Sequence, residues 1–215
     1  MDASREVNQA VTQDRESEGP IGDLEVFVTA GEAYPAFERA FMNAKEQISA
    51  SFRLFDLTTK LHSPEARKLG DTWFDLMVDT LNRGVSVRIV VTDFDPVAAP
   101  DLHQLAWQTK RQIAAVRELA KDDAKLEFDV ALHDARAGWV PKMVFFPFVR
   151  QKMGELNESW SKMNEDERAR FRSETPRLRN ICYENDKGRL CFPIKLVDLY
   201  PATHHQKMAV FDRRL

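Results

Sequence analysis

Apolar positions along this chain switch between the two-residue period of strands and the longer period of helices. Residues 24–29 (LEVFVT) are rich in β-branched and aromatic side chains and predict a strand. An amphipathic helix is predicted next, from apolar residues at helical spacing: Phe37, Phe41, Ala44 and Ile48. A second strand is expected at residues 49–55. The chain therefore begins its folded part as strand, helix, strand.

A second helix is predicted to start at Ser63-Pro64-Glu65, where a capping hydroxyl, a proline and an acid occur together. Its buried face would consist of Trp73, Leu76, Met77, Thr80 and Leu81. Gly84 supplies the stop signal. Residues 85–91 (VSVRIVV) are nearly all apolar, which is typical of a strand buried on both faces of a sheet.

A third helical stripe follows, made of Leu102, Leu105, Ala106, Thr109, Ile113 and Val116. Residues 125–132 then predict another strand. Strands separated by helices of this length need crossover connections. We therefore predict an α/β fold with a mixed, largely parallel β-sheet flanked by helices.

The alternation of predicted strands and helices stops at about residue 133 and resumes at about residue 190. We interpret this block as a helical insertion on the sheet scaffold, with a charged helix at about residues 164–172 and a return to the sheet at residues 190–199. Residues 1–22 are polar, acidic and poor in large apolar side chains, which predicts a disordered tail. Residues 23–215 are expected to form one domain.

Composition narrows the class of protein. The net charge is -3 with 30% charged residues, a balance that argues against nucleic acid as the partner. The start of the chain has no signal-peptide pattern, and no apolar run approaches the length needed to span a bilayer. With two cysteines, a disulfide framework is not indicated. We expect a cytoplasmic protein whose membrane contact, if any, is peripheral.

The chemistry-bearing pattern is His-x-Lys-x-x-x-x-Asp, formed by His205, Lys207 and Asp212. On a strand, His205 and Lys207 would share one face about 7 Å apart. Met208 and Val210 would point to the other face, toward a core. An imidazole nucleophile beside a fixed cation suits an anionic phosphodiester. Asp212 has the opposite parity from His205 and is expected to brace the turn after the strand.

This pattern, preceded by YPATHHQK, ISASFRLFD and RGVSVRIVVTDFD, resembles the phospholipase D superfamily, in particular the N-terminal half of bacterial phospholipase D-like proteins. The resemblance implies hydrolysis or exchange of a glycerophospholipid head group through a phosphohistidine intermediate, without a metal or cofactor. It makes His205 the nucleophile and Lys207 the phosphate-binding residue, with Asp212 as the third member of the catalytic motif. Thr203 shares the parity of His205 and is a further candidate for substrate binding.

The sequence contains one such motif, and His62, His103 and His133 lack a lysine two residues later. We therefore expect half a site, completed by a second motif beyond Leu215 or by a second chain, and an inactive fragment when alone. The alternatives are a phosphatidyltransferase of the cardiolipin synthase type, a nuclease of the same superfamily, and a non-catalytic lipid-binding or assembly module.

Other residues carry two interpretations each. Asp56, Asp93 and Asp95 follow predicted strands, where carboxylates bind ligands or cap turns. Residues 140–149 are either a core segment or a surface for membranes and acyl chains, with cations nearby: Lys142, Arg150 and Lys152. Five arginines among acids indicate a solvated face: Arg168, Arg170, Arg172, Arg177 and Arg179. His204 is expected to be structural, and Cys182 and Cys191 to be inert thiols.

Overall fold

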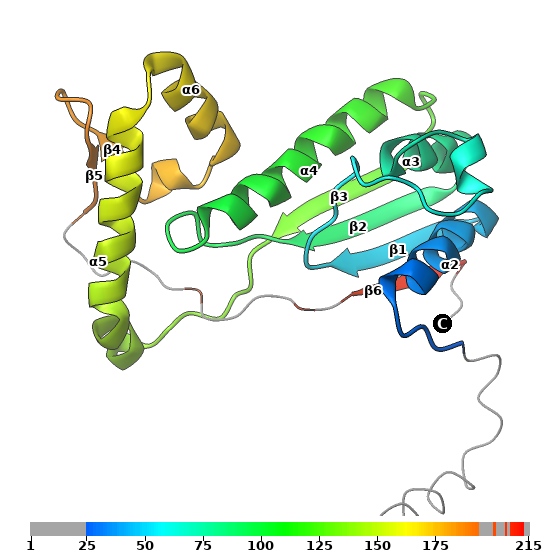
Figure 1. Cartoon of the computed structure of the whole chain (residues 1–215), viewed down its shortest axis with the longest axis horizontal. Helices are drawn as coiled ribbons and strands as arrows, with labels where there is room; N and C mark the ends of the chain where they lie inside the picture. Colours follow the sequence, from blue (N-terminus) through cyan, green and yellow to red (C-terminus); the bar gives the residue numbers. More distant parts are fainter. Residues whose placement is uncertain (1–24, 194–199, 201–204, 206, 213–215) are drawn as a thin grey trace, which may run out of the picture. The chain divides into compact units, whose positions relative to one another are not determined.

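The computed structural model describes residues 25–193, 200, 205 and 207–212. The chain has an α/β fold around a four-stranded sheet with the order β3-β2-β1-β6 (Figure 1). Its strands are β1 (Gln47–Phe52), β2 (Ser86–Thr92), β3 (Leu126–Ala131) and β6 (Met208–Phe211). The first three are parallel to one another, and β6 is antiparallel to β1. The predicted mixed, largely parallel sheet is confirmed.

Helices precede and connect the parallel strands in the predicted order, one before β1, one between β1 and β2, and one between β2 and β3. They are α2 (Ala30–Asn43), α3 (Trp73–Asn82) and α4 (Pro100–Leu119). The chain divides into two units at Ala33 and Tyr34, so the description of the sheet concerns residues 34–215. Apolar side chains of α2, α3 and α4 gather with those of the strands in one hydrophobic core, and Phe41, Trp73 and Ile113 are among its fully buried members.

The sheet buries one face. Along β2, Val87, Ile89 and Val91 are buried, whereas Arg88 between them is exposed. Arg88 pairs with Glu127 of β3 across the register at 3.4 Å, and both side chains are mostly exposed. The prediction that β2 is buried on both faces is therefore wrong. The helices that pack on this sheet all contribute to the core on one side of it. The apolar run of residues 85–91 therefore did not mean that helices cover both faces of the sheet.

The strand predicted at residues 24–29 is also wrong. Residues 25–28 have no regular structure, and α2 begins at Ala30. A capping box competes with the strand signal, because Glu32 accepts hydrogen bonds from the backbone N–H groups of Val28 and Thr29 at 3.0 and 3.1 Å. Local capping therefore outweighed the β propensity of Val26 and Val28, which are both exposed.

The second predicted helix starts later than its sequence signal suggested. After Ser63 the chain forms only the 3₁₀ turn η2 (Ala66–Lys68), and α3 begins at Trp73. Asp75 accepts the backbone N–H groups of Asp71 and Thr72, each at 2.9 Å, and so caps α3 at its observed start. The predicted stop is confirmed, since Gly84 has a φ of 88°, a conformation that glycine adopts without strain.

The block between β3 and β6 is largely helical. It contains α5 (Trp139–Lys162), α6 (Glu165–Glu174), the 3₁₀ turn η3 (Leu178–Asn180) and a small hairpin of β4 (Tyr183–Glu184) and β5 (Leu190–Cys191). These elements share a second core that includes Leu156, Trp160 and Leu178. Leu190 pairs with β4 and not with the main sheet, so the expected return to the sheet there is wrong, while residues 194–199 lie outside the described part.

Candidate functional site

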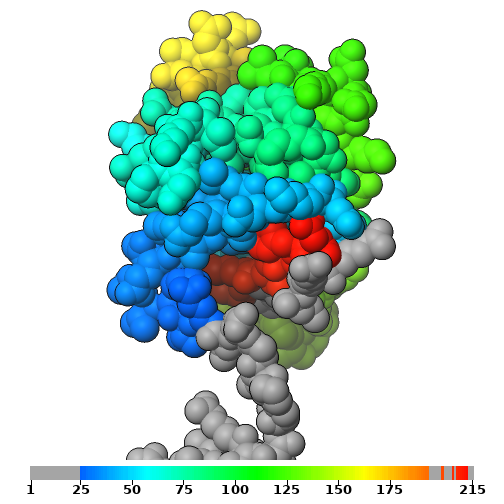
Figure 2. Space-filling view, turned by 90° about the vertical axis from the view of Figure 1, so that its right-hand side faces the viewer, coloured from blue at the N-terminus to red at the C-terminus, as the bar shows by residue number. Residues whose placement is uncertain are grey.

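The register of β6 determines where the His-x-Lys motif enters the fold. Met208 is opposite Ser51 near the end of β1, and Phe211 is opposite Ile48 near its start. In Figure 2 the atoms of β6 (red) lie directly against those of β1 (light blue). Because β6 runs antiparallel to β1, the residues that precede it are at the carboxyl end of the parallel strands. Ligands bind outside this end in open α/β sheets.

His205 and Lys207 lie at that end, and both are exposed. They come immediately before β6, which starts at Met208 rather than including the motif. Strand alternation therefore does not fix the relative directions of the two side chains. Thr203 and His204 lie outside the described residues.

The prediction that Met208 and Val210 anchor the strand in the core is wrong. Met208 is 54% exposed, whereas Ala209 and Phe211 pack against the main core. The ring centroid of Phe211 lies 5.5 Å from that of Phe41 and 5.9 Å from that of Phe37. The helices lie on the side of the sheet that Ala209 and Phe211 face, so the parity of the anchor residues is the reverse of the predicted one.

Asp212 lies at the other end of β6 from His205 and Lys207. Its carboxylate accepts hydrogen bonds from the backbone N–H groups of Lys45 at 3.0 Å, Glu46 at 2.7 Å and Gln47 at 3.1 Å. The residue has a φ of 50°, which places it in the left-handed region that aspartate tolerates. These bonds attach the end of β6 to the start of β1. They agree with the bracing role expected for Asp212.

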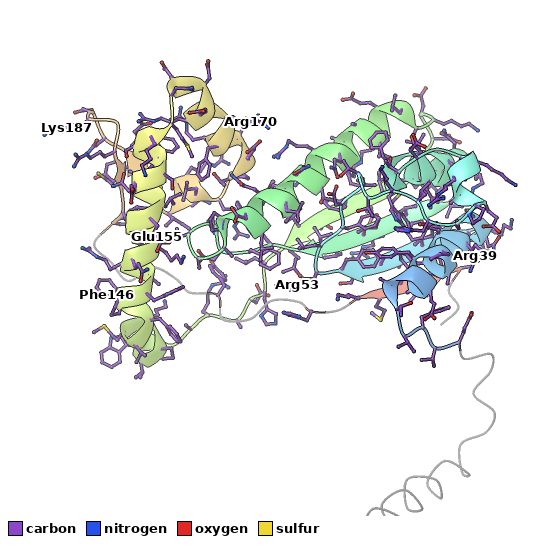
Figure 3. The ribbon with its side chains drawn as sticks, viewed as in Figure 1. Arg39, Arg53, Phe146, Glu155, Arg170 and Lys187 are labelled. Carbon is purple, nitrogen blue, oxygen red and sulfur yellow. The ribbon has the colours of Figure 1, made fainter. Side chains whose placement is uncertain are left out.

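Arg53 is a cation at the carboxyl end of β1 that the sequence analysis did not single out. It directly follows β1 (Figure 3), and its guanidinium carbon lies 5.5 Å from the ring centroid of Phe94. Its Nε is buried and has no hydrogen-bond partner among the described residues. No sequence signal marked this position, because Arg53 falls inside the strand expected at residues 49–55, whereas β1 ends at Phe52. The carboxyl end of β1 therefore brings Arg53 to the same end of the sheet as His205 and Lys207.

Asp93 follows β2 and is fully buried in a polar cluster. Its carboxylate accepts hydrogen bonds from His103 Nδ1 at 2.6 Å, from Arg177 Nη1 at 2.9 Å and from Trp107 Nε1 at 3.4 Å. Burial raises the pKa of Asp93, but the hydrogen bond and charge of His103 and the bonds from Arg177 and the Phe94 N–H outweigh it and lower that pKa. Since an ionised carboxylate only accepts, His103 Nδ1 carries the proton.

This cluster is closed to substrate. Both Asp93 and His103 have side chains with no exposed surface, and His103 Nε2 has no hydrogen-bond partner in the described part of the chain. Arg177 comes from the segment after α6, so its bond to Asp93 joins the helical block to the end of β2. We therefore assign Asp93 a structural role.

The other two aspartates cap turns, as one of the two interpretations predicted. Asp56 accepts the backbone N–H of Thr58 at 2.9 Å, and Asp95 accepts those of Val97 and Ala98 at 2.8 Å. Burial raises the pKa of Asp56, but its hydrogen bonds from Thr58 and Gln112 lower it overall.

The segment before β6 contacts the loop after β3. The guanidinium carbon of Arg136 lies 4.2 Å from the ring centroid of Tyr200, the first residue of the YPATHHQK segment. His133, in the same loop, accepts the backbone N–H of Ala135 through Nδ1 at 3.0 Å. The loop after β3 therefore lies against Tyr200, five residues before His205 in the sequence.

The structure also shows the surroundings of the apolar segment at residues 140–149, of the arginines and of Cys182. Residues 140–149 are not a core segment, because their large side chains are mostly exposed. Arg172 and Arg170 are exposed and pair with Glu184 and Glu174, as expected for a solvated face. The same prediction is wrong for Arg168 and Arg177, which are partly buried: Arg168 lies over the ring of Trp160, and Arg177 pairs with the buried Asp93. Burial raises the pKa of the Cys182 thiol to about 11, which fits an inert thiol.

No protein-family model matches this chain, and no curated protein matches it either. The resemblance to the phospholipase D superfamily therefore stays a prediction from the motif. Among the described residues there is no cluster of three or more His, Cys, Asp or Glu side chains with the arrangement of a metal site. Within the same part of the chain, no helix is long and apolar enough to cross a membrane.

Proposed function

We propose that this chain carries the first half of a phospholipase D-type phosphodiesterase site that acts on the head-group ester of glycerophospholipids. The observation that carries the proposal is the position of the His-x-Lys pair. His205 and Lys207 are exposed beside the carboxyl end of β1, where an α/β sheet presents its ligand-binding residues. Arg53 adds a second cation at that end.

In this mechanism a ring nitrogen of His205 attacks phosphorus. The bond from phosphorus to the head-group oxygen breaks, and a phosphohistidine forms. Lys207 stabilises the non-bridging oxygens as their negative charge develops. A histidine from a second motif, in another part of the protein or in another chain, protonates the leaving alcohol. Water, or a second alcohol, then attacks phosphorus and releases His205, which gives hydrolysis or head-group exchange.

The backbone around the motif suits this role. Phe211 and Asp212 fix the far end of β6 to the core and to the start of β1. On the other side of the motif, Arg136 contacts the ring of Tyr200. The anchored register of β6 supports the proposal, because it keeps Met208, the residue after Lys207, beside the carboxyl end of β1.

A half site can be tested with a substrate that needs no general acid. We expect bis(p-nitrophenyl) phosphate to transfer a p-nitrophenylphosphoryl group to His205 of the 215-residue chain and to release one p-nitrophenolate, because this leaving group departs without being protonated. The adduct would be detected by intact mass and peptide mapping at alkaline pH, where phosphohistidine persists. This chain should form the adduct without turning it over, because the second histidine that would activate water or an alcohol belongs to another motif.

The control is another exposed histidine. His62 lies in the loop after β1, and its ring stacks on that of Tyr34 at 5.1 Å. We expect His62→Asn to form the adduct as the wild type does, His205→Asn to form none, and Lys207→Met to form it more slowly. A wild-type chain that is never modified, or an adduct that persists in His205→Asn, would contradict the proposal.

A further inference from the structure

One surface of this protein is unusually apolar for an exposed helix. In the α5 apolar segment, defined as residues 139–149, every residue except Lys142 is apolar. Its exposed large side chains are Trp139 (70%), Val140 (60%), Met143 (50%), Val144 (68%), Phe145 (54%), Phe146 (40%) and Phe148 (47%). Figure 3 shows side chains projecting from several sides of this part of α5, where Phe146 is labelled. Such a patch marks an interaction surface.

The distribution of these side chains around the helix says what kind of surface covers them. Successive residues of an α-helix are about 100° apart, so the exposed positions occupy most of the circumference. The second half of α5 differs, because Leu156 and Trp160 share one buried face in the second core. A protein groove covers one face of a helix. A helix that is apolar nearly all round is better matched by immersion in an apolar phase.

The charges around the segment are of one sign. No Asp or Glu occurs between Asp134 and Glu155, whereas four cations do: Arg136, Lys142, Arg150 and Lys152. The guanidinium carbon of Arg150 lies 5.9 Å from the ring centroid of Phe146, and Lys152 Nζ lies 5.9 Å from that of Phe148. Lys152 also pairs with Glu155 at 2.8 Å. Cations that lie beside aromatic rings are typical of the level of lipid head groups.

We propose that the α5 apolar segment is a membrane-docking helix that inserts into the interface of an anionic bilayer. At about 1.5 Å per residue it is about 16 Å long, half of the roughly 30 Å of a hydrocarbon core, so it docks and does not span. Aromatic and aliphatic side chains enter the acyl region, and Arg150 and Lys142 contact lipid phosphates. The positive charges around the segment are the reason for choosing an anionic bilayer as its partner.

The test is sedimentation of the 215-residue chain with sucrose-loaded vesicles of phosphatidylcholine and phosphatidylglycerol. Because Val144 and Phe145 are exposed, the double variant Val144→Ser/Phe145→Ser should fold as the wild type does. We expect it to lower the partition coefficient by about tenfold or more, since two apolar side chains no longer leave water. Arg150→Gln should weaken binding to phosphatidylglycerol vesicles and leave binding to pure phosphatidylcholine unchanged.

Matched controls are exposed apolar residues elsewhere, Leu119→Ser (64% exposed) and Tyr183→Ser (65% exposed), which should bind as the wild type does. His205→Asn should also bind normally, so a failure of docking and a failure of the catalytic proposal are distinguishable. A wild type that stays in the supernatant, or equal binding by the double variant, would overturn the proposal. So would sedimentation equilibrium showing that the segment forms a dimer interface that the double variant abolishes.

Discussion

The backbone N–H of Glu46 donates a 2.7 Å hydrogen bond to Asp212, which lies 166 residues later in the chain. Asp212 is the last residue of the His-x-Lys-x-x-x-x-Asp pattern, and its carboxylate also accepts the N–H groups of Lys45 and Gln47. One side chain thus closes the loop between α2 and β1 and fixes the register of β6. The register in turn determines where His205 and Lys207 lie.

We expect Asp212→Ala to lower the free energy of unfolding by about 2 kcal/mol, because it leaves several backbone donors without their charged acceptor. Asp212→Asn should cost about half as much, since it keeps one acceptor oxygen and tolerates the left-handed conformation. Urea denaturation measures both. Equal stability of the alanine variant and the wild type would show that these bonds do not hold β6.

Because Phe211 and not Met208 faces the core, substitutions at these two positions of β6 should have different effects on stability. Phe211→Ala should destabilise the protein by about 2 kcal/mol or more, because the ring packs on Phe41 and Phe37 and leaves a cavity. Met208→Ala should change the stability by less than about 0.5 kcal/mol, because its side chain is mostly exposed. Thermal or urea unfolding of the two variants decides the matter. A larger effect at Met208 would mean that the strand faces the other way.

Two glycines in different surroundings should respond oppositely to alanine. A Cβ at Gly70 would lie 2.2 Å from Asp75 Cβ, so Gly70→Ala must displace the residue that caps α3. We expect a loss of about 1–3 kcal/mol. At Gly154, within α5, nothing lies within 4 Å of the added Cβ. Gly154→Ala should therefore stabilise the protein by about 0.5–1 kcal/mol, the ordinary helix propensity difference. Urea midpoints that move in the same direction would refute this pair.

The buried cluster at Asp93 predicts a dependence of stability on pH. Because the pKa of Asp93 is lowered in the folded protein, the unfolded chain takes up its proton first as the pH falls. The stabilisation from this carboxylate is present at neutral pH and is lost below about pH 4, the usual pKa of aspartate. Urea denaturation between about pH 3 and pH 7 should show this loss.

Two variants isolate the contribution of the cluster. Asp93→Asn should flatten the acid limb of that stability profile and cost about 3 kcal/mol at neutral pH, because His103 and Arg177 lose their charged partner. Arg177→Met removes one partner from the partly exposed side and should cost less. An unchanged acid limb in Asp93→Asn would assign the pH dependence to other groups.

Local patterns were sufficient wherever a structure depends on neighbouring residues. The helix at α6 begins after Asn164 as predicted, because Asn164 and Glu167 satisfy each other's backbone N–H groups at 2.9 and 2.8 Å. Gly84 ends the turn after α3 for an equally local reason, its positive φ. The order of strands and helices follows from the same periodicities, and with it the α/β class.

The sequence by itself therefore determined the α/β class, the order of the parallel strands and their helices, and the His-x-Lys-x-x-x-x-Asp motif, but not every element, since residues 25–28 form no strand and Leu190 pairs outside the main sheet. The tertiary structure decided which faces are buried: one face of β2, Phe211 rather than Met208 on β6, and little of the α5 apolar segment. It also brought Asp212 to Glu46 and Arg177 to Asp93. The physical reason is that periodicity and capping act over a few residues, whereas burial and long-range hydrogen bonds depend on which elements pack together.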